Sequence, residues 1–283
     1  MKRMLLIFLL GLTACSGSAT PTATLPPVPV TVATFTPPPL ATVTPVAQPT
    51  PRASAQSLPT PSEPVNLTVT AADQAQLAAT FYPPAIEKAP GILLLHTLDS
   101  VGGCACRKDW DSFARELQKL GYAVLAFDFR GHGDSPGPED WVNKAPGDVL
   151  AAWGTLLQQT GVDREASGAV GASIGANLAL MVGSNNQDMK VVIALSPGED
   201  YHGLRPLGVL SNFTLPPVRP VLLAASAEDT DSYNSVQKMA AQFPMFEPYY
   251  LANAGHGTAM LGDASFVQFL FMWLETHLAI LKG

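Results

Sequence analysis

A serine flanked by two glycines is the strongest candidate for chemistry in this sequence. Ser173 lies in Gly171-Ala-Ser-Ile-Gly175, between an apolar run that ends at Ala172 and another that begins at Ile174. The glycines of such a segment leave room at a sharp strand-to-helix turn, which lifts the serine hydroxyl out of the sheet. The N-terminus of the following helix favours negative charge beside that hydroxyl. We predict that Ser173 is a nucleophile for acyl transfer; the alternative is a tight turn with an incidental serine.

A serine hydroxyl is a weak nucleophile until a base takes its proton, so a histidine is needed. We predict that His256 is this base. It lies in the small-residue loop Asn253-Ala-Gly-His-Gly257, between the last predicted strand and the last predicted helix, where an imidazole can reach the edge of the sheet. The other four histidines have simpler interpretations. His96 ends a predicted strand, His132 organises a loop, and His202 and His277 lie in an irregular stretch and in the closing helix.

A carboxylate is needed to hold the histidine in the correct tautomer and to stabilise its charged form. The strand predicted at 221–225 is followed by Glu228 and Asp229, with Asp231 two residues further on. We predict that Asp229 is this acid, and Glu228 and Asp231 remain alternatives. The resulting order along the chain is Ser173, Asp229, His256.

The elements that must position these residues are short apolar strands alternating with helices. Two alternating segments around residues 71–75 predict a hairpin, and wholly apolar runs predict strands covered on both faces. The predicted strands are 66–70, 76–82, 91–96, 122–127, 169–172, 191–195, 221–225 and 249–251. The predicted helices are 109–120, 148–159, 174–183, 232–243 and 265–281. This order predicts one α/β domain, with a mostly parallel sheet, an N-terminal antiparallel hairpin and helices on both faces.

The chain resembles the α/β-hydrolase superfamily, in particular its dienelactone-hydrolase-like and prolyl-oligopeptidase-like branches. The resemblance covers roughly residues 66–281. It rests on Gly-x-Ser-x-Gly, on the block Gly-Tyr-Ala-Val-Leu-Ala-Phe-Asp-Phe-Arg-Gly-His-Gly at 121–133 and on Gly-His-Gly at 255–257, in the family's order. It implies the same fold and a Ser-Asp-His order of catalytic residues.

The resemblance also implies an oxyanion hole made of two backbone N–H groups. One belongs to Ile174, the residue after the nucleophile, and the other to Thr97 or Leu98. Many family members have His-Gly where this chain has His96-Thr97. A β-branched residue narrows the allowed backbone angles at that point, so the second donor stays open between Thr97 and Leu98.

Two cysteines follow in the same loop, in Gly102-Gly-Cys-Ala-Cys106. Cys104 and Cys106 are either free or reversibly oxidised thiols, or a disulfide that fixes the loop. We expect no metal site, because one Cys-x-Cys supplies two ligands and the sequence has no matching pair.

The N-terminus has the pattern of an export signal. Lys2 and Arg3 precede the apolar run 4–12, which is too short to span a bilayer. Leu-Thr-Ala-Cys at 12–15 resembles the lipobox of bacterial lipoproteins, which implies a lipid on the Cys15 thiol. Residues 16–64 hold thirteen of the 26 prolines and ten threonines, a composition that cannot bury a core. We expect a signal peptide over 1–14, a lipidated Cys15 with a Thr/Pro-rich linker over 15–64, and the hydrolase domain over 65–283.

The charge balance and the motifs together predict a function. The net charge of −7 and the absence of a basic stripe argue against a nucleic-acid partner. The 25 residues between Leu195 and Val221 are too few for a large helical cap, which favours an open site for a small acyl substrate. We expect an extracytoplasmic serine hydrolase, anchored to a membrane through Cys15 at the cell surface or in the periplasm, that cleaves a short ester or lactone without a cofactor. The alternatives are a prolyl-oligopeptidase-like serine peptidase and a non-catalytic surface binding protein.

Overall fold

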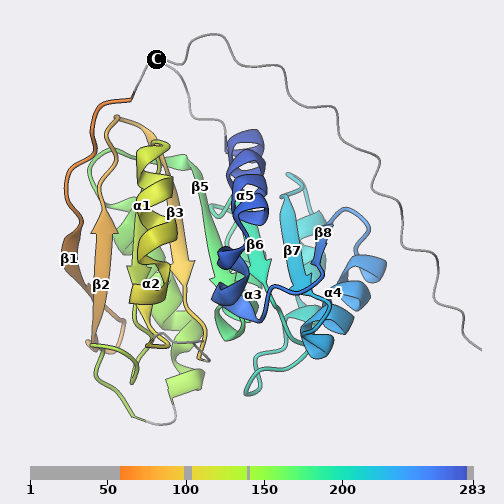
Figure 1. The fold of residues 1–283 in the computed structure, drawn as a ribbon. Coiled ribbons are helices and arrows are strands. Elements are labelled where there is room, and N and C mark those ends of the chain that lie inside the picture. Colours follow the sequence, from red (N-terminus) through yellow and green to blue (C-terminus); the bar gives the residue numbers. More distant parts are fainter. Residues whose placement is uncertain (1–57, 99–103, 139–140, 279–283) are drawn as a thin grey trace, which may run out of the picture. The chain divides into compact units, whose positions relative to one another are not determined.

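A single sheet organises the computed structural model, which describes residues 58–98, 104–138 and 141–278. Its strands are β1 (Val65–Thr70), β2 (Gln76–Tyr82), β3 (Ala89–Leu95), β4 (Ala123–Phe127), β5 (Val162–Ala172), β6 (Val191–Leu195), β7 (Val221–Ser226) and β8 (Glu247–Leu251). They lie side by side in the order β1-β2-β4-β3-β5-β6-β7-β8. Figure 1 shows this order from the orange N-terminal strands to the blue C-terminal ones. The predicted signal peptide, Cys15 and the linker up to residue 57 lie outside the described residues.

The sheet is antiparallel at its N-terminal edge and parallel elsewhere. β1 and β2 form the predicted hairpin, and β2 runs antiparallel to β4. From β4 through β3, β5, β6 and β7 to β8, every neighbouring pair is parallel. β3, β4, β6 and β7 are buried along their whole length, as expected of parallel strands with helices on both faces. The predicted fold class is confirmed.

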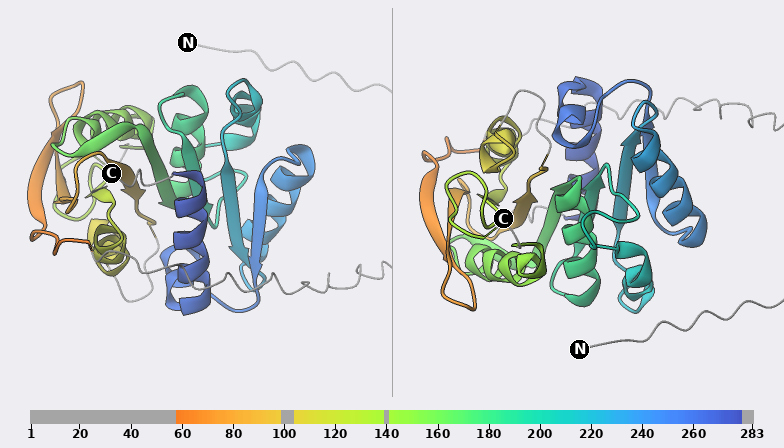
Figure 2. Two further views of the ribbon diagram at one scale, coloured as in Figure 1. Left: turned by 90° about the horizontal axis from the view of Figure 1, so that it is seen from above. Right: turned by 90° about the horizontal axis from the view of Figure 1, so that it is seen from below.

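Helices cover both faces of this sheet. They are α1 (Asp111–Lys119), α2 (Ala145–Leu157), α3 (Ile174–Asn185), α4 (Thr230–Gln242) and α5 (Ala264–His277). α1 and α5 pack on one face, and α2, α3 and α4 on the other, as the two views in Figure 2 show. Five short 3₁₀ helices complete the described part; they are η1 (Arg107–Trp110), η2 (Trp141–Asn143), η3 (Pro206–Gly208), η4 (Leu210–Thr214) and η5 (Gly257–Gly262). Within residues 58–98, 104–138 and 141–278, no helix has the length and apolarity needed to cross a membrane.

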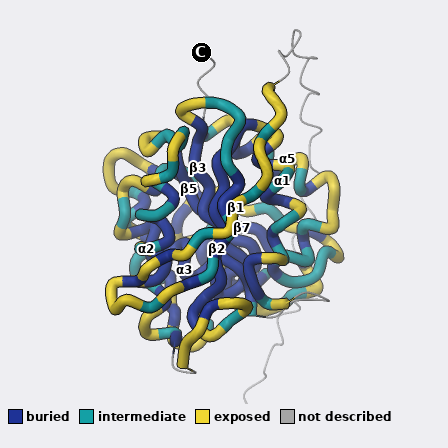
Figure 3. The backbone as a smooth tube through the Cα atoms, turned by 90° about the vertical axis from the view of Figure 1, so that its left-hand side faces the viewer, coloured by how far each residue is buried: buried dark blue, intermediate teal, exposed yellow. Residues whose placement is uncertain are grey.

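The alternation of side chains along each strand divides the core into two layers. In β3, Leu93 and Leu95 pack with α2 and α3, whereas Ile92 and Leu94 pack with α1 and α5. This is the two-residue period of a strand whose faces are both covered. The buried strands form the dark centre of Figure 3 and the exposed loops its periphery.

The observed elements differ from the predicted ones mainly at their ends. The helix predicted from Asp148 begins at Ala145, because Pro146 fits the first turn, where a backbone N–H is not needed. β5 extends back to Val162, into polar residues that the apolar pattern did not mark. The segment from 196 to 220 holds only η3 and η4, which agrees with the prediction of little or no cap.

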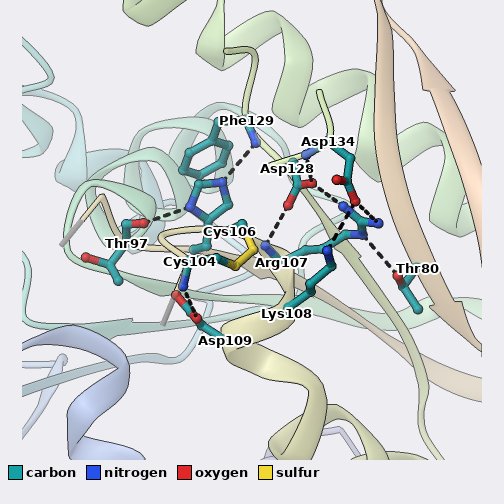
Figure 4. The surroundings of a disulfide bond; sticks show 11 residues. Thr80, Thr97, Cys104, Cys106, Arg107, Lys108, Asp109, Asp128, Phe129 and Asp134 are labelled. Carbon is teal, nitrogen blue, oxygen red and sulfur yellow. Dashed lines mark hydrogen bonds and ion pairs between the residues drawn. A yellow bond between two sulfur atoms is a disulfide. The ribbon is translucent and has the colours of Figure 1, made fainter. Parts of the chain in front are cut away.

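A buried carboxylate joins the chain segments that leave β3 and β4. Asp128 is fully buried directly after β4. It pairs with the guanidinium of Arg107 and accepts hydrogen bonds from the backbone N–H groups of Arg107, at 2.7 Å, and Asp134, at 2.8 Å. Arg107 also donates to Thr80 on β2, at 3.1 Å. Figure 4 shows these links in one view. A buried charge with several donors is stable only while they remain in place, so Asp128 fixes both loops.

We expect Asp128→Ala to lower the free energy of unfolding by about 3–5 kcal/mol, because it leaves the buried Arg107 guanidinium without its main partner. Urea denaturation of the purified protein measures this loss. Asp134→Ala is the matched control: its carboxylate also contacts Arg107, at 2.9 Å, but is exposed to solvent, so the expected loss is at most about 1 kcal/mol. Equal losses in the two variants would contradict the role given to Asp128.

Candidate active site

Ser173 lies at the sharp turn between β5 and α3. Its backbone has φ 56° and ψ −121°, a conformation that L-residues rarely adopt. A Cβ on Gly171 would lie 2.1 Å from the carbonyl oxygen of Gly175, and one on Gly175 would lie 2.3 Å from that of Leu95. Neither position accepts a side chain, which explains both glycines of the motif. The Ser173 N–H donates to the Leu195 carbonyl at 2.8 Å and ties the turn to β6.

The three residues predicted for catalysis lie in one hydrogen-bonded chain. The Ser173 Oγ lies 2.7 Å from His256 Nε2. The other ring nitrogen, Nδ1, lies 2.6 Å from Asp229 Oδ2. Asp229 caps α4 and His256 precedes η5. Ser173 is 83 positions and Asp229 is 27 positions from His256 along the chain, and the three meet at the carboxyl ends of the parallel strands. In this geometry the imidazole can take the serine proton while the carboxylate holds the opposite N–H.

The environment of Asp229 keeps it ionised. Partial burial raises the pKa of this carboxyl, but hydrogen bonds from Ser232 and His256 and the charge of His256 outweigh burial, and the net pKa lies below the ordinary 3.8. Asp229 therefore stays negative at neutral pH and can accept the His256 Nδ1–H.

The two alternative acids have other positions. Glu228 accepts a hydrogen bond from the Gly255 N–H at 2.5 Å and so holds the histidine loop rather than the imidazole. Asp231 is exposed in the first turn of α4. The carboxylate that contacts His256 is that of Asp229.

The end of β3 is held by a histidine with a defined tautomer. His96 is fully buried, and its Nε2 accepts a hydrogen bond from the Phe129 N–H at 2.9 Å. Because Nε2 is the acceptor, the ring hydrogen lies on Nδ1, which donates to the Thr97 carbonyl at 2.7 Å. Burial lowers the pKa of His96 from 6.5 to about 4. His96 is thus a neutral structural residue that orients the peptide following Thr97.

Thr97 lies close to the histidine loop. It is fully buried, and a Cβ on Gly257 would lie 3.5 Å from the Thr97 Cβ and 3.6 Å from that of Ala172. The threonine side chain therefore packs beside the residue that follows His256. Residues 99–103, which follow Leu98, lie outside the described residues.

The three remaining histidines are not brought to Ser173. His132 lies 3.0 Å from the Arg130 carbonyl, and its ring lies edge-on to Trp141 at 4.8 Å. His277 donates to the Trp273 carbonyl, one helical turn before it, at 2.9 Å. His202 is exposed in a turn, at φ 53°.

Cys104 and Cys106 are joined by a disulfide, with their Cα atoms 5.1 Å apart. The sequence left open whether these two residues are free or reversibly oxidised thiols or form a disulfide, and the structure has the disulfide. The Asp109 carboxylate accepts from the Cys104 N–H at 3.1 Å, and Figure 4 shows the disulfide between this contact and the Arg107 network. In the described part of the chain, no group of three His, Cys, Asp or Glu side chains is placed to hold a metal ion.

Asn177 is a buried polar residue on the helix after Ser173 that the sequence analysis missed. It is fully buried on α3, one helical turn after Ser173. Its side chain donates to the carbonyls of Gly198 and Leu204, at 3.0 and 2.9 Å, and accepts from the Gly198 N–H at 3.0 Å. The sequence contains one signal for this residue, an asparagine within an otherwise apolar helix. A side-chain amide buried there needs hydrogen-bond partners.

Comparisons with known proteins agree with the fold. The model of the Alpha/beta hydrolase family matches residues 92–276. The alpha/beta hydrolase GrgF from Penicillium sp. sh18 is 14% identical, with a TM-score of 0.63 over 77% of this chain and 100% of that one. An esterase from Pyrococcus furiosus is 19% identical, with a TM-score of 0.62 over 77% and 92%. A dienelactone hydrolase from Anabaena variabilis is 18% identical, with a TM-score of 0.57 over 77% and 99%. No curated protein matches the sequence.

The depressed pKa of His96 predicts how stability depends on pH. Between the ordinary pKa of 6.5 and about 4, the unfolded chain binds a proton that folded His96 does not. The wild type should therefore lose about 3 kcal/mol of stability from this group as the pH falls from 7 to 4. His96→Asn removes that titration. Denaturation at pH 7 and at pH 4 should therefore show that the variant loses about 3 kcal/mol less stability between the two pH values than the wild type does.

A second measurement addresses the same prediction without a variant. ¹⁵N NMR of histidine-labelled protein should show one ring that is neutral and protonated at Nδ1 at pH 5. Protonation of all five rings at that pH would contradict the assignment.

Proposed function

The chain belongs to the alpha/beta hydrolase family, and from this premise we propose that it is a serine hydrolase that cleaves small carboxylic esters or lactones. The observation that carries the proposal is the chain of contacts from Ser173 Oγ through His256 to Asp229, at 2.7 and 2.6 Å. These distances lie within the range in which a base activates a hydroxyl nucleophile.

The proposed reaction is acyl transfer to water. Ser173 Oγ attacks the substrate carbonyl carbon while His256 Nε2 takes the serine proton, and Asp229 stabilises the imidazolium. His256 then gives that proton to the leaving oxygen as the bond to the acyl carbon breaks. In the second half, the oxygen of a water molecule attacks the acyl carbon while His256 Nε2 takes a proton from that water. His256 then returns the proton to Ser173 Oγ as the Oγ–carbon bond breaks and the carboxylic acid leaves.

The oxyanion is assigned to two backbone N–H groups. Ile174 is the first residue of α3, whose N–H has no intrahelical acceptor. For the second donor, the geometry favours Leu98 over Thr97. The Thr97 carbonyl points to His96, and in a trans peptide the N–H of the next residue points the opposite way. The Leu98 N–H therefore points away from His96.

The substrate class follows from what surrounds the serine. The segment between β6 and β7 contributes two 3₁₀ helices of three and five residues, which leaves little material to enclose a long substrate. An esterase and a dienelactone hydrolase share the fold. A short acyl ester or lactone therefore fits the proposal better than a peptide.

We also propose that the enzyme acts outside the cytoplasm on a lipid anchor. The support is the sequence: a basic start, an apolar run over 4–12, the tetrapeptide that ends at Cys15, and a proline-rich linker before the domain. At about 3.1 Å per residue where it is extended, such a linker would hold the domain well away from a membrane.

We expect Ser173→Ala and His256→Ala each to lower kcat for p-nitrophenyl acetate by about 10⁴-fold or more, with little change in Tm. A fluorophosphonate probe should label the wild type and not Ser173→Ala. An unlabelled, folded wild type that hydrolyses no ester in a panel of short esters and lactones would refute the proposed function.

A matched pair of substitutions distinguishes Asp229 from Glu228 as the catalytic acid. Asp229→Asn should cost about 10⁴-fold in kcat, because it favours the wrong imidazole tautomer. Glu228→Gln keeps a hydrogen-bond acceptor for the Gly255 N–H and should leave kcat nearly unchanged. The reverse pattern would mean that the acid is misassigned.

For the anchor, we expect Cys15→Ser to move the protein from the membrane fraction to the soluble fraction of the host envelope. The thiol is the lipid acceptor, and a hydroxyl does not replace it. Mass spectrometry of the wild-type N-terminus should find a diacylglyceryl group on Cys15. Continued membrane association of Cys15→Ser would exclude lipidation as the sole attachment.

A further inference from the structure

The loop that carries His256 has a backbone that its own sequence leaves free. Gly255 and Gly257 flank the histidine, and both have positive φ, at 72° and 58°. Glycine adopts positive and negative φ about equally readily, so local sterics do not fix the peptide groups on either side of His256. Hydrogen bonds to other segments must therefore hold the imidazole at its distances of 2.7 Å from Ser173 and 2.6 Å from Asp229.

One of these hydrogen bonds is made by a serine directly after β6. Ser196 is fully buried, and its Oγ accepts from the Gly257 N–H at 2.9 Å. The Ser196 hydroxyl hydrogen points to Met260 Sδ in η5, 3.4 Å away, which leaves the oxygen lone pairs free to accept. The carbonyl of the same peptide group, that of His256, accepts from the Ala259 N–H at 3.1 Å. The peptide group that follows His256 is thus held at both its donor and its acceptor.

The other end of the loop is held by two acceptors that differ in exposure. At the end of β7, Ser226 is fully buried and its Oγ accepts from the Ala254 N–H at 2.9 Å. Glu228, which accepts from the Gly255 N–H, is exposed, so water can take its place. Removal of the Ser196 hydroxyl would instead leave a buried donor without an acceptor, which is a larger disturbance.

The backbone of Ser196 has a conformation that serine rarely adopts. Its φ is 52°, in the left-handed region that disfavours residues with a Cβ. Its N–H donates to the Ala224 carbonyl on β7 at 2.7 Å, and its carbonyl accepts from the Tyr201 hydroxyl at 3.3 Å. The ring of Tyr201 lies edge-on to that of His256, with centroids 6.3 Å apart. A glycine would fit this backbone with less strain, but it would supply no hydroxyl to the histidine loop.

We infer that Ser196 is a positioning residue for the proposed catalytic base. Its hydroxyl holds the peptide group after His256 and so keeps His256 Nε2 within hydrogen-bond distance of Ser173 Oγ. The inference rests on the proposed function, because it assigns a role in proton transfer to His256. Ser196 takes up no proton in the reaction and acts only through the position of the imidazole. Its loss should therefore slow proton transfer from Ser173 and leave substrate binding almost unchanged.

Ser196→Ala and Ser196→Gly both remove the hydroxyl, but they differ in their effect on the backbone. At φ 52° alanine keeps the unfavourable Cβ, whereas glycine removes it. We expect kcat for p-nitrophenyl acetate to fall about 10- to 100-fold in both variants, the cost of a small misplacement of a catalytic group, with KM within about twofold. The second-order rate of inactivation by a fluorophosphonate should fall by the same factor, because His256 must also take the Ser173 proton in that reaction.

Ser167→Ala is the matched control for the lost hydrogen bond. Ser167 on β5 is also fully buried, and its Oγ accepts from the Gly91 N–H at the same distance, 2.9 Å. Gly91 lies near the amino end of β3, away from the catalytic residues at the carboxyl ends of the strands. Ser167→Ala should lower Tm about as much as the Ser196 variants do, and it should leave kcat and the inactivation rate unchanged.

Four results would overturn the inference while the proposed function stands. They are an unchanged kcat in both Ser196 variants, a loss in only one of the two, a change in KM alone, and an equal loss of kcat in Ser167→Ala. A loss in only one Ser196 variant would mean that the backbone at this position, and not the hydroxyl, is responsible. A wild type that is neither labelled nor active would overturn the proposed function, and the inference with it.

Discussion

The close approach of α3 to the end of β3 is the constraint on which the rest of the structure depends. A Cβ on Gly175 would lie within 2.6 Å of the carbonyl oxygens of both Leu95 and His96. The chain can pass from β5 into α3 only because no side chain stands there. This contact puts the nucleophile turn and the proposed oxyanion loop side by side, so a shift of one moves the other. The strained backbone of Ser173 is held by that packing and by the hydrogen bond to Leu195.

Buried polar groups fix the loops that the strands alone leave free. Strand pairing between β3 and β4 ends at Leu95 and Phe127, and the chain then diverges in two loops. His96 bridges them through the Phe129 N–H, and Asp128 bridges them through Arg107. Each bridge is satisfied only when both loops are in place, which is how buried polar networks specify one arrangement. A neutral His96 suits this role, because a charged ring would lose its acceptor nitrogen.

Features that depend on a local sequence pattern could be predicted, whereas contacts between segments far apart in the sequence could not. Wholly apolar runs marked the parallel strands, and the Ser173, Asp229, His256 order followed from where each lies relative to a strand end. The proposed preference for Leu98 over Thr97 rests on the direction of one peptide group, whose carbonyl contacts His96, and the partner of His96, Phe129, lies 33 residues away. Asn177 and the backbone on either side of Tyr201 are brought together only by the fold. Nothing in the spacing indicates that the ring of Tyr201, 28 positions after Ser173, lies edge-on to that of His256, whereas the order of Ser173, Asp229 and His256 follows the order of the strands.

The segment between β6 and β7 is short, yet α3 holds it at both ends. Asn177, in the first turns of α3, binds the backbone around Tyr201. At the other end, the buried Arg219 donates to the carbonyls of Gly183 and Asn186, at 2.5 and 2.8 Å, at the C-terminal end of α3, where a positive charge is favourable. A loop attached at two points to one helix moves with that helix. The position of Tyr201 relative to Ser173 is therefore set within α3 and its own loop, and it does not require a cap domain to close over the site.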